Sequence, residues 1–216
     1  MANCEKLIPT IIKWEAGVDP KKEENIGLTN RELFEKARKN GYGNDPVDSG
    51  GPTMVGIILE TYKAYCKSKG KRTPTINDLK EMPYEEWFEI FKTRFWDKML
   101  ADQINNQSIA NLCVNTVWGT GPGYIKIIQC VLGVKQDGVV GPITLAAINN
   151  YPSQKILFEK LWLRRKKFFE DIVESSVKAY ERKRGRKATE RELLKYTKKR
   201  FLKGWLNRLN DFQFSE

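Results

Sequence analysis

The chain has 216 residues, of which 40% are hydrophobic, and a formal net charge of +11 from 38 Lys and Arg against 27 Asp and Glu. This length suits one large domain or two small ones, and the hydrophobic content is sufficient for a packed core. The sequence contains no histidine, which excludes a Ser-His-Asp triad, a Cys-His dyad and any histidine-ligated metal. Its chemistry must therefore use carboxylates, Lys, Tyr or Cys.

The positive charge alone does not choose a partner. It would attract nucleic acid, an anionic membrane surface or an acidic cell-wall polymer, and it equally fits a soluble protein with a solvated basic face. The four cysteines, Cys4, Cys66, Cys113 and Cys130, are scattered without a C-x-x-C pair, so we expect free thiols and no metal or other cofactor.

No apolar run approaches the roughly 20 residues that a membrane span requires. Residues 1–5 lack the basic and then apolar pattern of a secretory signal. We therefore expect a monomer without a membrane span that is made in the cytoplasm.

Residues 4–16 are expected to form an amphipathic helix with Ile8, Ile11 and Ile12 on one side, and Gly17 suits its C-cap. Glu15 then lies in the last turn. A helix C-terminus and apolar neighbours both disfavour a negative charge, which favours the protonated carboxyl that a general acid needs. Position alone fits a solvated residue at a helix end better than a catalytic residue.

The next segments alternate between polar helices and loops. Residues 29–40 predict a short polar helix, and the Gly-, Pro- and Asp-rich residues 41–56 predict a loop or tight hairpin. A helix is expected again over 53–67, followed by a basic linker (68–75) and one turn (77–81). A helix from about Pro83 carries Trp87, Phe88 and Phe91, which we assign to the core.

The second half is also helical by pattern. Helices are expected over 103–118, 124–132, 143–149, 152–181 and 189–209. Glycine-rich turns at 119–123 and 133–142 and a basic stretch at 181–187 separate them. The basic run at 178–187 is expected to be a solvated, partly flexible face, and it could also bind anionic wall polymers. The pattern as a whole predicts a mainly α protein.

Two carboxylates, Asp45 and Asp48, lie in a glycine-rich loop beside Tyr42, Asn44 and Thr53. Glycosidases need an acid that protonates the leaving oxygen and a second carboxylate on the other side of the bond. Glu15 at a helix end and one of these aspartates would fit that requirement. The alternative, which we favour for at least one of the two, is a turn residue bonding its own backbone.

The order of these residues resembles a known family. Glu15-Ala16-Gly17, followed by Tyr42-Gly43-Asn44-Asp45-Pro46-x-Asp48-x-Gly50-Gly51-x-Thr53-x-x-Gly56-Ile57, is similar to the muramidases of glycoside hydrolase family 108. Further similar stretches are Arg94-Phe95-Trp96, Asn115 to Gly123, Leu132 to Leu145 with its D-G-x-x-G-P pattern, and Gly204 to Arg208. The Leu132 to Leu145 stretch resembles a predicted peptidoglycan-binding segment whose glycines form turns.

The resemblance implies a lysozyme-like helical fold with a small hairpin that bears the active-site loop. It implies a catalytic region over 1–126 and a helical peptidoglycan-binding region over 127–216, with Glu15 as the catalytic residue. The sequence departs from the family by an insertion at 18–41, which must loop out if Glu15 is to face Asp45, or which covers the cleft instead.

Several side chains are candidates for binding the sugar. Trp96, Trp118 and Tyr124 could stack on sugar rings, with Trp118 the best placed because it precedes a glycine loop. Asn115 could bind an N-acetyl or hydroxyl group, or could cap a helix end. Tyr42, Asn44 and Thr53 belong to the loop motif and are assigned to substrate binding.

Three hypotheses follow. The first is a muramidase that cleaves between N-acetylmuramic acid and N-acetylglucosamine, with a weak preference for inversion from its similarity to phage lysozymes. It would reach the wall through a holin or a dedicated secretion route. The second is a non-catalytic wall-binding or secretion-accessory protein of the same fold. The third, a nucleic-acid-binding protein, ranks lowest because basic residues are spread through the sequence with acidic residues between them.

Overall fold

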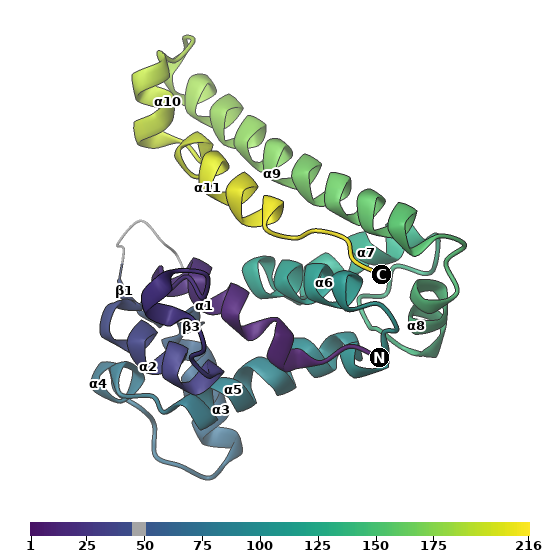
Figure 1. Cartoon of the computed structure of the whole chain (residues 1–216). Helices are drawn as coiled ribbons and strands as arrows, with labels where there is room; N and C mark the ends of the chain where they lie inside the picture. The colour runs from purple at the N-terminus through teal and green to yellow at the C-terminus, as the bar shows by residue number, and fades with distance from the viewer. Residues whose placement is uncertain (45–50) are drawn as a thin grey trace. The chain divides into compact units, whose positions relative to one another are not determined.

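The fold consists mostly of helices, as the computed structural model of residues 1–44 and 51–216 shows (Figure 1). The described residues contain 11 α-helices and one small three-stranded sheet. The expected mainly α, lysozyme-like fold class is thereby confirmed.

Contacts within the chain define two compact units. The N-terminal unit comprises Ala2–Asp102, and the C-terminal unit comprises Gln103–Glu216 together with Met1. The division expected between residues 126 and 127 separates functions and not compact units, and it stays a prediction.

The N-terminal unit contains five α-helices and the sheet. The helices are α1 (Ile8–Ala16), α2 (Asn30–Asn40), α3 (Leu59–Ser68), α4 (Ile76–Lys80) and α5 (Tyr84–Phe91), and the strands are β1 (Tyr42–Gly43), β2 (Thr53–Met54) and β3 (Ile57–Ile58). A π-helical turn, Lys92–Trp96, continues from α5.

Helix α1 covers the later part of the helix predicted over residues 4–16, and Cys4–Lys6 form a separate 3-10 turn before it. Pro9 lies in the first turn of α1, where backbone N–H groups have no partner within the helix, so proline removes no hydrogen bond there. Ile8, Ile11 and Ile12 are fully buried. Gly17 ends the helix with a φ of 73° and donates its N–H to the Lys13 carbonyl, so the predicted C-cap is confirmed.

Helix α2 lies within the inserted segment and is part of the core. Its N-terminus is fixed by a capping box in which Thr29 and Glu32 bond each other's backbone N–H. Phe34 is fully buried, with its ring centroid 5.3 Å from Trp87 and 5.6 Å from Tyr84. The inserted segment therefore contributes its apolar face to the core of the unit.

The sheet is an antiparallel meander in the order β1-β2-β3. Its second turn has positive φ at both central residues, 42° at Val55 and 78° at Gly56, as the tight hairpin turn of type I′ requires. Val55 is held there by its N–H, which donates to Gly41, and by its carbonyl, which accepts from the Trp87 indole, both at 2.9 Å. The helix expected from residue 53 therefore begins only at Leu59.

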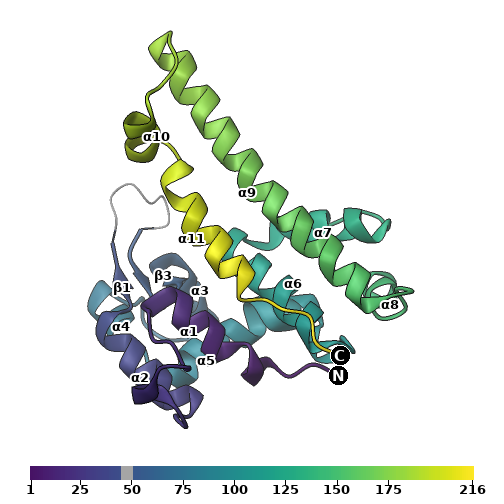
Figure 2. The same ribbon diagram turned by 45° about the horizontal axis from the view of Figure 1, so that its top comes forward.

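The C-terminal unit contains six helices. They are α6 (Gln107–Thr120), α7 (Ile125–Leu132), α8 (Pro142–Asn149), α9 (Gln154–Arg184), α10 (Glu190–Tyr196) and α11 (Lys199–Asn210). Helix α11 runs back along α9 in both views (Figures 1 and 2). Phe169 and Trp205 stack between them at 5.1 Å, and the Trp162 indole donates to the Leu209 carbonyl.

The single helix expected over 189–209 is in fact two, broken at Thr197. The buried Thr197 hydroxyl accepts from the Lys199 N–H and donates to the Leu193 carbonyl, while the Lys198 N–H donates to the Ser176 hydroxyl of α9. These bonds end α10 and start α11, so that α11 can turn back onto α9.

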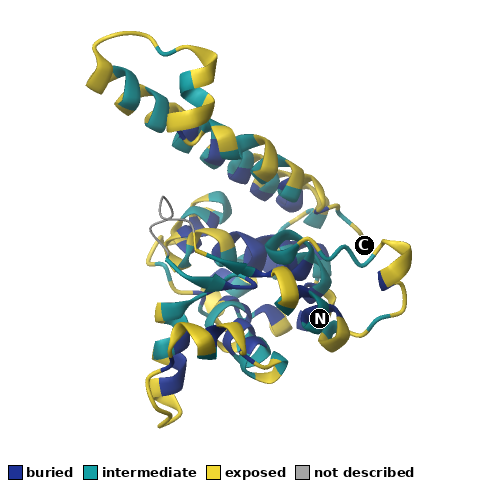
Figure 3. Cartoon of the chain, turned by 90° about the vertical axis from the view of Figure 1, so that its left-hand side faces the viewer, coloured by how far each residue is buried: buried dark blue, intermediate teal, exposed yellow. Residues whose placement is uncertain are grey.

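The end of the α9–α11 hairpin is strongly basic. Residues 177–203, which we call the basic arm, hold 12 Lys and Arg against three Glu, and they are mostly exposed (Figure 3). Basic residues are therefore more concentrated in one part of the chain than was assumed when nucleic-acid binding was ranked lowest. No helix in the described part of the chain is long and apolar enough to cross a membrane.

Acid is expected to loosen the connection between α9 and α10. Two bonds from the Arg186 guanidinium, and then the Thr189 N–H, lower the pKa of Glu192 to about 2 from its ordinary 4.5. Because the folded pKa is the lower one, the carboxylate stabilises the fold above its ordinary pKa, and this contribution is lost as the pH falls towards about 2. Amide exchange at Thr189 and Glu192, compared between about pH 5 and pH 2 at matched intrinsic rates, should show this opening. A Glu192→Gln variant, already open at the higher pH, should show little further change, and an equal acid response in both proteins would contradict the assignment.

Candidate active site

Glu15 is the second-last residue of α1 and is half-buried. The three buried isoleucines fix α1 against the core, and the left-handed Gly17 stops it one turn after Ile12. The local sequence therefore fixes where the Glu15 backbone lies, at the rim of the N-terminal unit's core.

The insertion begins and ends at nearly the same point. A Cβ built on Gly41 would lie 3.3 Å from the Ala16 Cβ and only 2.7 Å from the Val55 Cγ2. Only glycine allows this close approach, which brings the end of α1 next to the entry of β1. The end of α1 that carries Glu15 thus adjoins the hairpin that carries the loop motif.

The loop-motif residues are divided between the two faces of the sheet. Tyr42 pairs with the buried Met54, and Gly43 pairs with Thr53. Because residues directly opposite share a face and successive residues alternate, Tyr42 and Thr53 point to opposite faces. Lys80 lies 4.4 Å above the Tyr42 ring. The Tyr42 and Thr53 side chains therefore do not share one face of the sheet, and their assignment to substrate binding stays a prediction.

The remaining residues of the loop are only partly described. Asn44 is exposed and directly follows β1. Asp45 and Asp48, the two candidates for the second carboxylate, lie outside the described residues. The assistance of Glu15 by Asp45, by Asp48 or by neither therefore stays open as a prediction.

Trp96 has a packing position and not a sugar-binding one. Its side chain is fully buried in the N-terminal unit, and its indole N–H donates to the Asp102 carboxylate at 2.7 Å. A ring enclosed on all sides offers no face to a sugar, so the predicted stacking by Trp96 is corrected. The buried Tyr124 likewise packs edge-on against Phe168 at 5.0 Å.

Asn115 and Trp118 lie on α6 in the C-terminal unit. Trp118 is half-buried, and its stacking on a sugar stays a prediction. Asn115 is in the interior of α6 and therefore does not cap its end. Its carboxamide oxygen accepts from the Nε and Nη2 of Arg208 at 3.0 and 2.8 Å.

Two arginines beside Asn115 were missed as site candidates. Arg165 of α9 and Arg208 of α11 line one pocket with Asn115. Arg208 closes the Gly204–Arg208 stretch, whose resemblance to a family motif was a usable signal. Arg165 lies in the middle of a long, basic helix and is not distinguishable there by pattern.

The D-G-x-x-G-P segment is structural, as interpreted from its glycines. The buried Gln129 side chain donates to Asp137, to the Val139 carbonyl and to Thr144, and it accepts from the Gly138 N–H. Gly138 has a φ of 82°, and α8 begins directly after Gly141. These bonds tie the turn to α7.

Two family models match the chain. Residues 34–121 match Glycosyl hydrolase 108, and residues 124–210 match the Predicted Peptidoglycan domain. The first match begins in α2, so it includes the loop motif and excludes Glu15. A comparison with curated protein sequences gives no match.

A solved structure shows the same fold. The structure of Brucella abortus SagA matches 84% of this chain and 91% of its own, with a TM-score of 0.59 and 23% sequence identity. At this identity the likeness shows the fold alone.

The loop motif and the D-G-x-x-G-P turn thus each fall inside the family region that the sequence resemblance implied. The two regions together support a peptidoglycan hydrolase kind of function with peptidoglycan as the partner. Residues 34–121 are thus similar to the glycosyl hydrolase 108 family, and residues 124–210 are similar to the Predicted Peptidoglycan domain.

Proposed function

We propose that the chain is an N-acetylmuramidase of the lysozyme type. It would cleave the bond between N-acetylmuramic acid and N-acetylglucosamine, with Glu15 donating a proton to the leaving oxygen. The observation that carries this proposal is the contact of α1 with the hairpin, where Ala16 adjoins Gly41. It supports a Glu15 carboxyl beside the family's loop despite the insertion.

The second carboxylate would come from Asp45 or Asp48. A carboxylate about 5 Å from Glu15 would form a covalent intermediate and retain the configuration, whereas roughly 6.5–9.5 Å leaves room for water and inverts it. We keep inversion as the proposal. The basic arm would add attraction to anionic groups of the wall.

Digestion of purified peptidoglycan tests the bond that is cleaved. The expected result is a cleared zone in a peptidoglycan gel and new reducing ends that are N-acetylmuramic acid. Reducing ends of N-acetylglucosamine would overturn the muramidase assignment. No clearing by the folded protein, with tight sedimentation onto the walls, would instead support a non-catalytic wall-binding protein.

The cellular setting is also a proposal. The enzyme would act on the wall after release through a holin or through a dedicated secretion route.

A further inference from the structure

A small pocket in the C-terminal unit has an unusual charge. It has a volume of about 190 Å³ and lies between α6, α9 and α11. The side chains that matter are Asn115, Thr120, Arg165, Phe169, Trp205 and Arg208. Two arginines and no acidic residue occur among the described residues that line it.

Arg165 is the most deeply buried charge of this pocket. Its side chain is 4% exposed, its Nη1 donates to the Thr120 hydroxyl at 3.2 Å, and its guanidinium lies 4.2 Å from the Phe169 ring centroid. Across residues 1–44 and 51–216, no carboxylate lies within ion-pair distance of it. A buried charge is costly without an anionic partner, and desolvation lowers the pKa of Arg165 to about 10, which leaves it charged at neutral pH.

The neighbouring side chains complete a donor-rich surface. The Asn115 oxygen holds the Arg208 guanidinium through two hydrogen bonds, which leaves the Asn115 amide group as a further donor. Trp205, stacked on Phe169 at 5.1 Å, adds an apolar wall. The pocket therefore offers N–H donors and positive charge next to a small apolar surface.

We propose that this pocket binds a carboxylate of peptidoglycan, either the terminal carboxylate of the peptide stem or the lactyl carboxylate of an N-acetylmuramic acid residue that carries no stem. Both groups place a methyl beside a carboxylate, which matches guanidinium donors next to an aromatic wall. Guanidinium binds carboxylates in a planar, two-bond geometry. The identity of the polymer rests on the proposed function, and the pocket's need for an anion does not.

The test is equilibrium binding of small probes to the full chain, with the NMR signals of the tryptophan indole N–H groups as the readout. The probes are N-acetylmuramic acid, N-acetylglucosamine, which lacks the lactyl group, and a stem peptide ending in D-alanine with its carboxylate free or amidated. We expect the Trp205 signal to respond to a carboxylate-bearing probe and not to its neutral counterpart. The probe that binds identifies which carboxylate is recognised.

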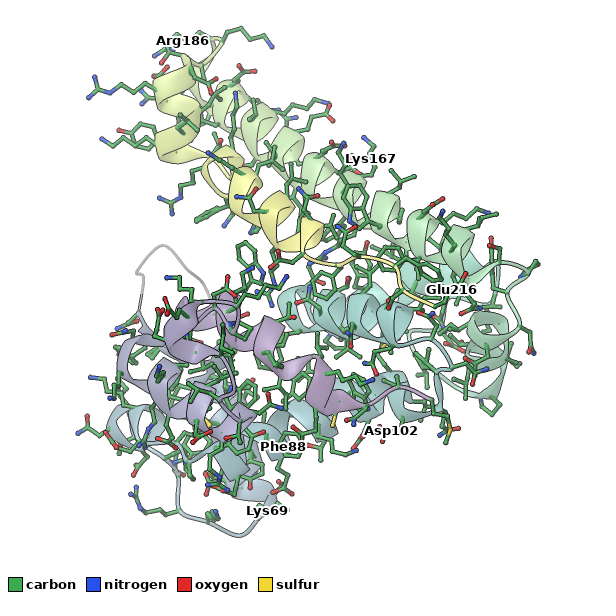
Figure 4. The ribbon with its side chains drawn as sticks, viewed as in Figure 1. Lys69, Phe88, Asp102, Lys167, Arg186 and Glu216 are labelled. Carbon is green, nitrogen blue, oxygen red and sulfur yellow. The ribbon has the colours of Figure 1, made fainter. Side chains whose placement is uncertain are left out.

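Arg165→Met should weaken that binding by about tenfold or more, because charged hydrogen bonds are lost. Lys167→Met is the matched control: it removes one charge from the same helix at an exposed position (Figure 4). Lys167 pairs with Asp171, and its replacement should leave binding unchanged. If Arg165→Met does not fold, Arg208→Gln, at the half-buried rim, should weaken binding in the same direction.

Two results would overturn the proposal. One is a wild-type chain whose Trp205 signal does not respond to any carboxylate probe, and the other is wild-type affinity in a folded Arg165→Met protein. Binding requires no catalysis, so a chain that binds the probe and clears no peptidoglycan would refute the muramidase and not the pocket. Clearing without carboxylate binding would refute only the pocket.

Discussion

Replacing Glu15 by Gln is expected to abolish lysis of purified cell walls, with a loss of at least about 100-fold in rate. The amide keeps the size and the hydrogen-bonding capacity of the side chain but cannot give up a proton to the glycosidic oxygen. Glu15 lies at the end of a helix whose apolar side is fully buried, so the variant should fold as the wild type does. Release of reducing ends from purified peptidoglycan, measured over time, gives the rate.

Glu23→Gln is the matched control for this variant. Glu23 is exposed in the same unit, begins the short turn Glu23–Asn25, and lies inside the insertion. It undergoes the same chemical change and should retain wild-type activity. Lysis by Glu15→Gln at a rate close to that of the control would remove Glu15 from the mechanism, whatever the role of the hairpin loop.

The sequence was sufficient for the elements whose ends are set locally. Gly17 stops α1 through its own left-handed conformation. The D-G-x-x-G-P turn was also predictable, because its glycines determine its backbone. In each case the signal and its structural effect lie within a few residues of each other.

The elements that were missed depend on distant contacts. A valine rarely adopts a positive φ, and Val55 does so because Gly41 and Trp87 bond its backbone. Thr197 breaks the last helix partly because α9 supplies Ser176. The charge excess of the pocket likewise arises only when α9 and α11 pack, which brings Arg165 near Arg208.

Trp87→Ala is expected to cause the largest loss of stability in the N-terminal unit. The side chain is fully buried between Phe34 and Phe91, whose rings lie 5.3 and 5.8 Å from it. Removing a buried tryptophan side chain costs about 3–5 kcal/mol in the free energy of unfolding. It also removes the indole N–H that holds the Val55 carbonyl in the hairpin turn. Thermal unfolding should show a decrease in Tm of roughly 10 °C.

Two further variants separate packing from the hydrogen bond. Phe88→Ala, on the same helix and stacked on Tyr84 at 5.8 Å, should cost clearly less, because Phe88 is only half-buried. Trp87→Phe keeps an aromatic ring and leaves the Val55 carbonyl without its donor, which should cost about 1–3 kcal/mol and raise amide exchange in the β2–β3 turn. Because this turn bonds Gly41, which adjoins the end of α1, Trp87→Phe should also lower lytic activity more than Phe88→Ala does. Equal activity in the two variants would show that the turn does not set the geometry of the active site.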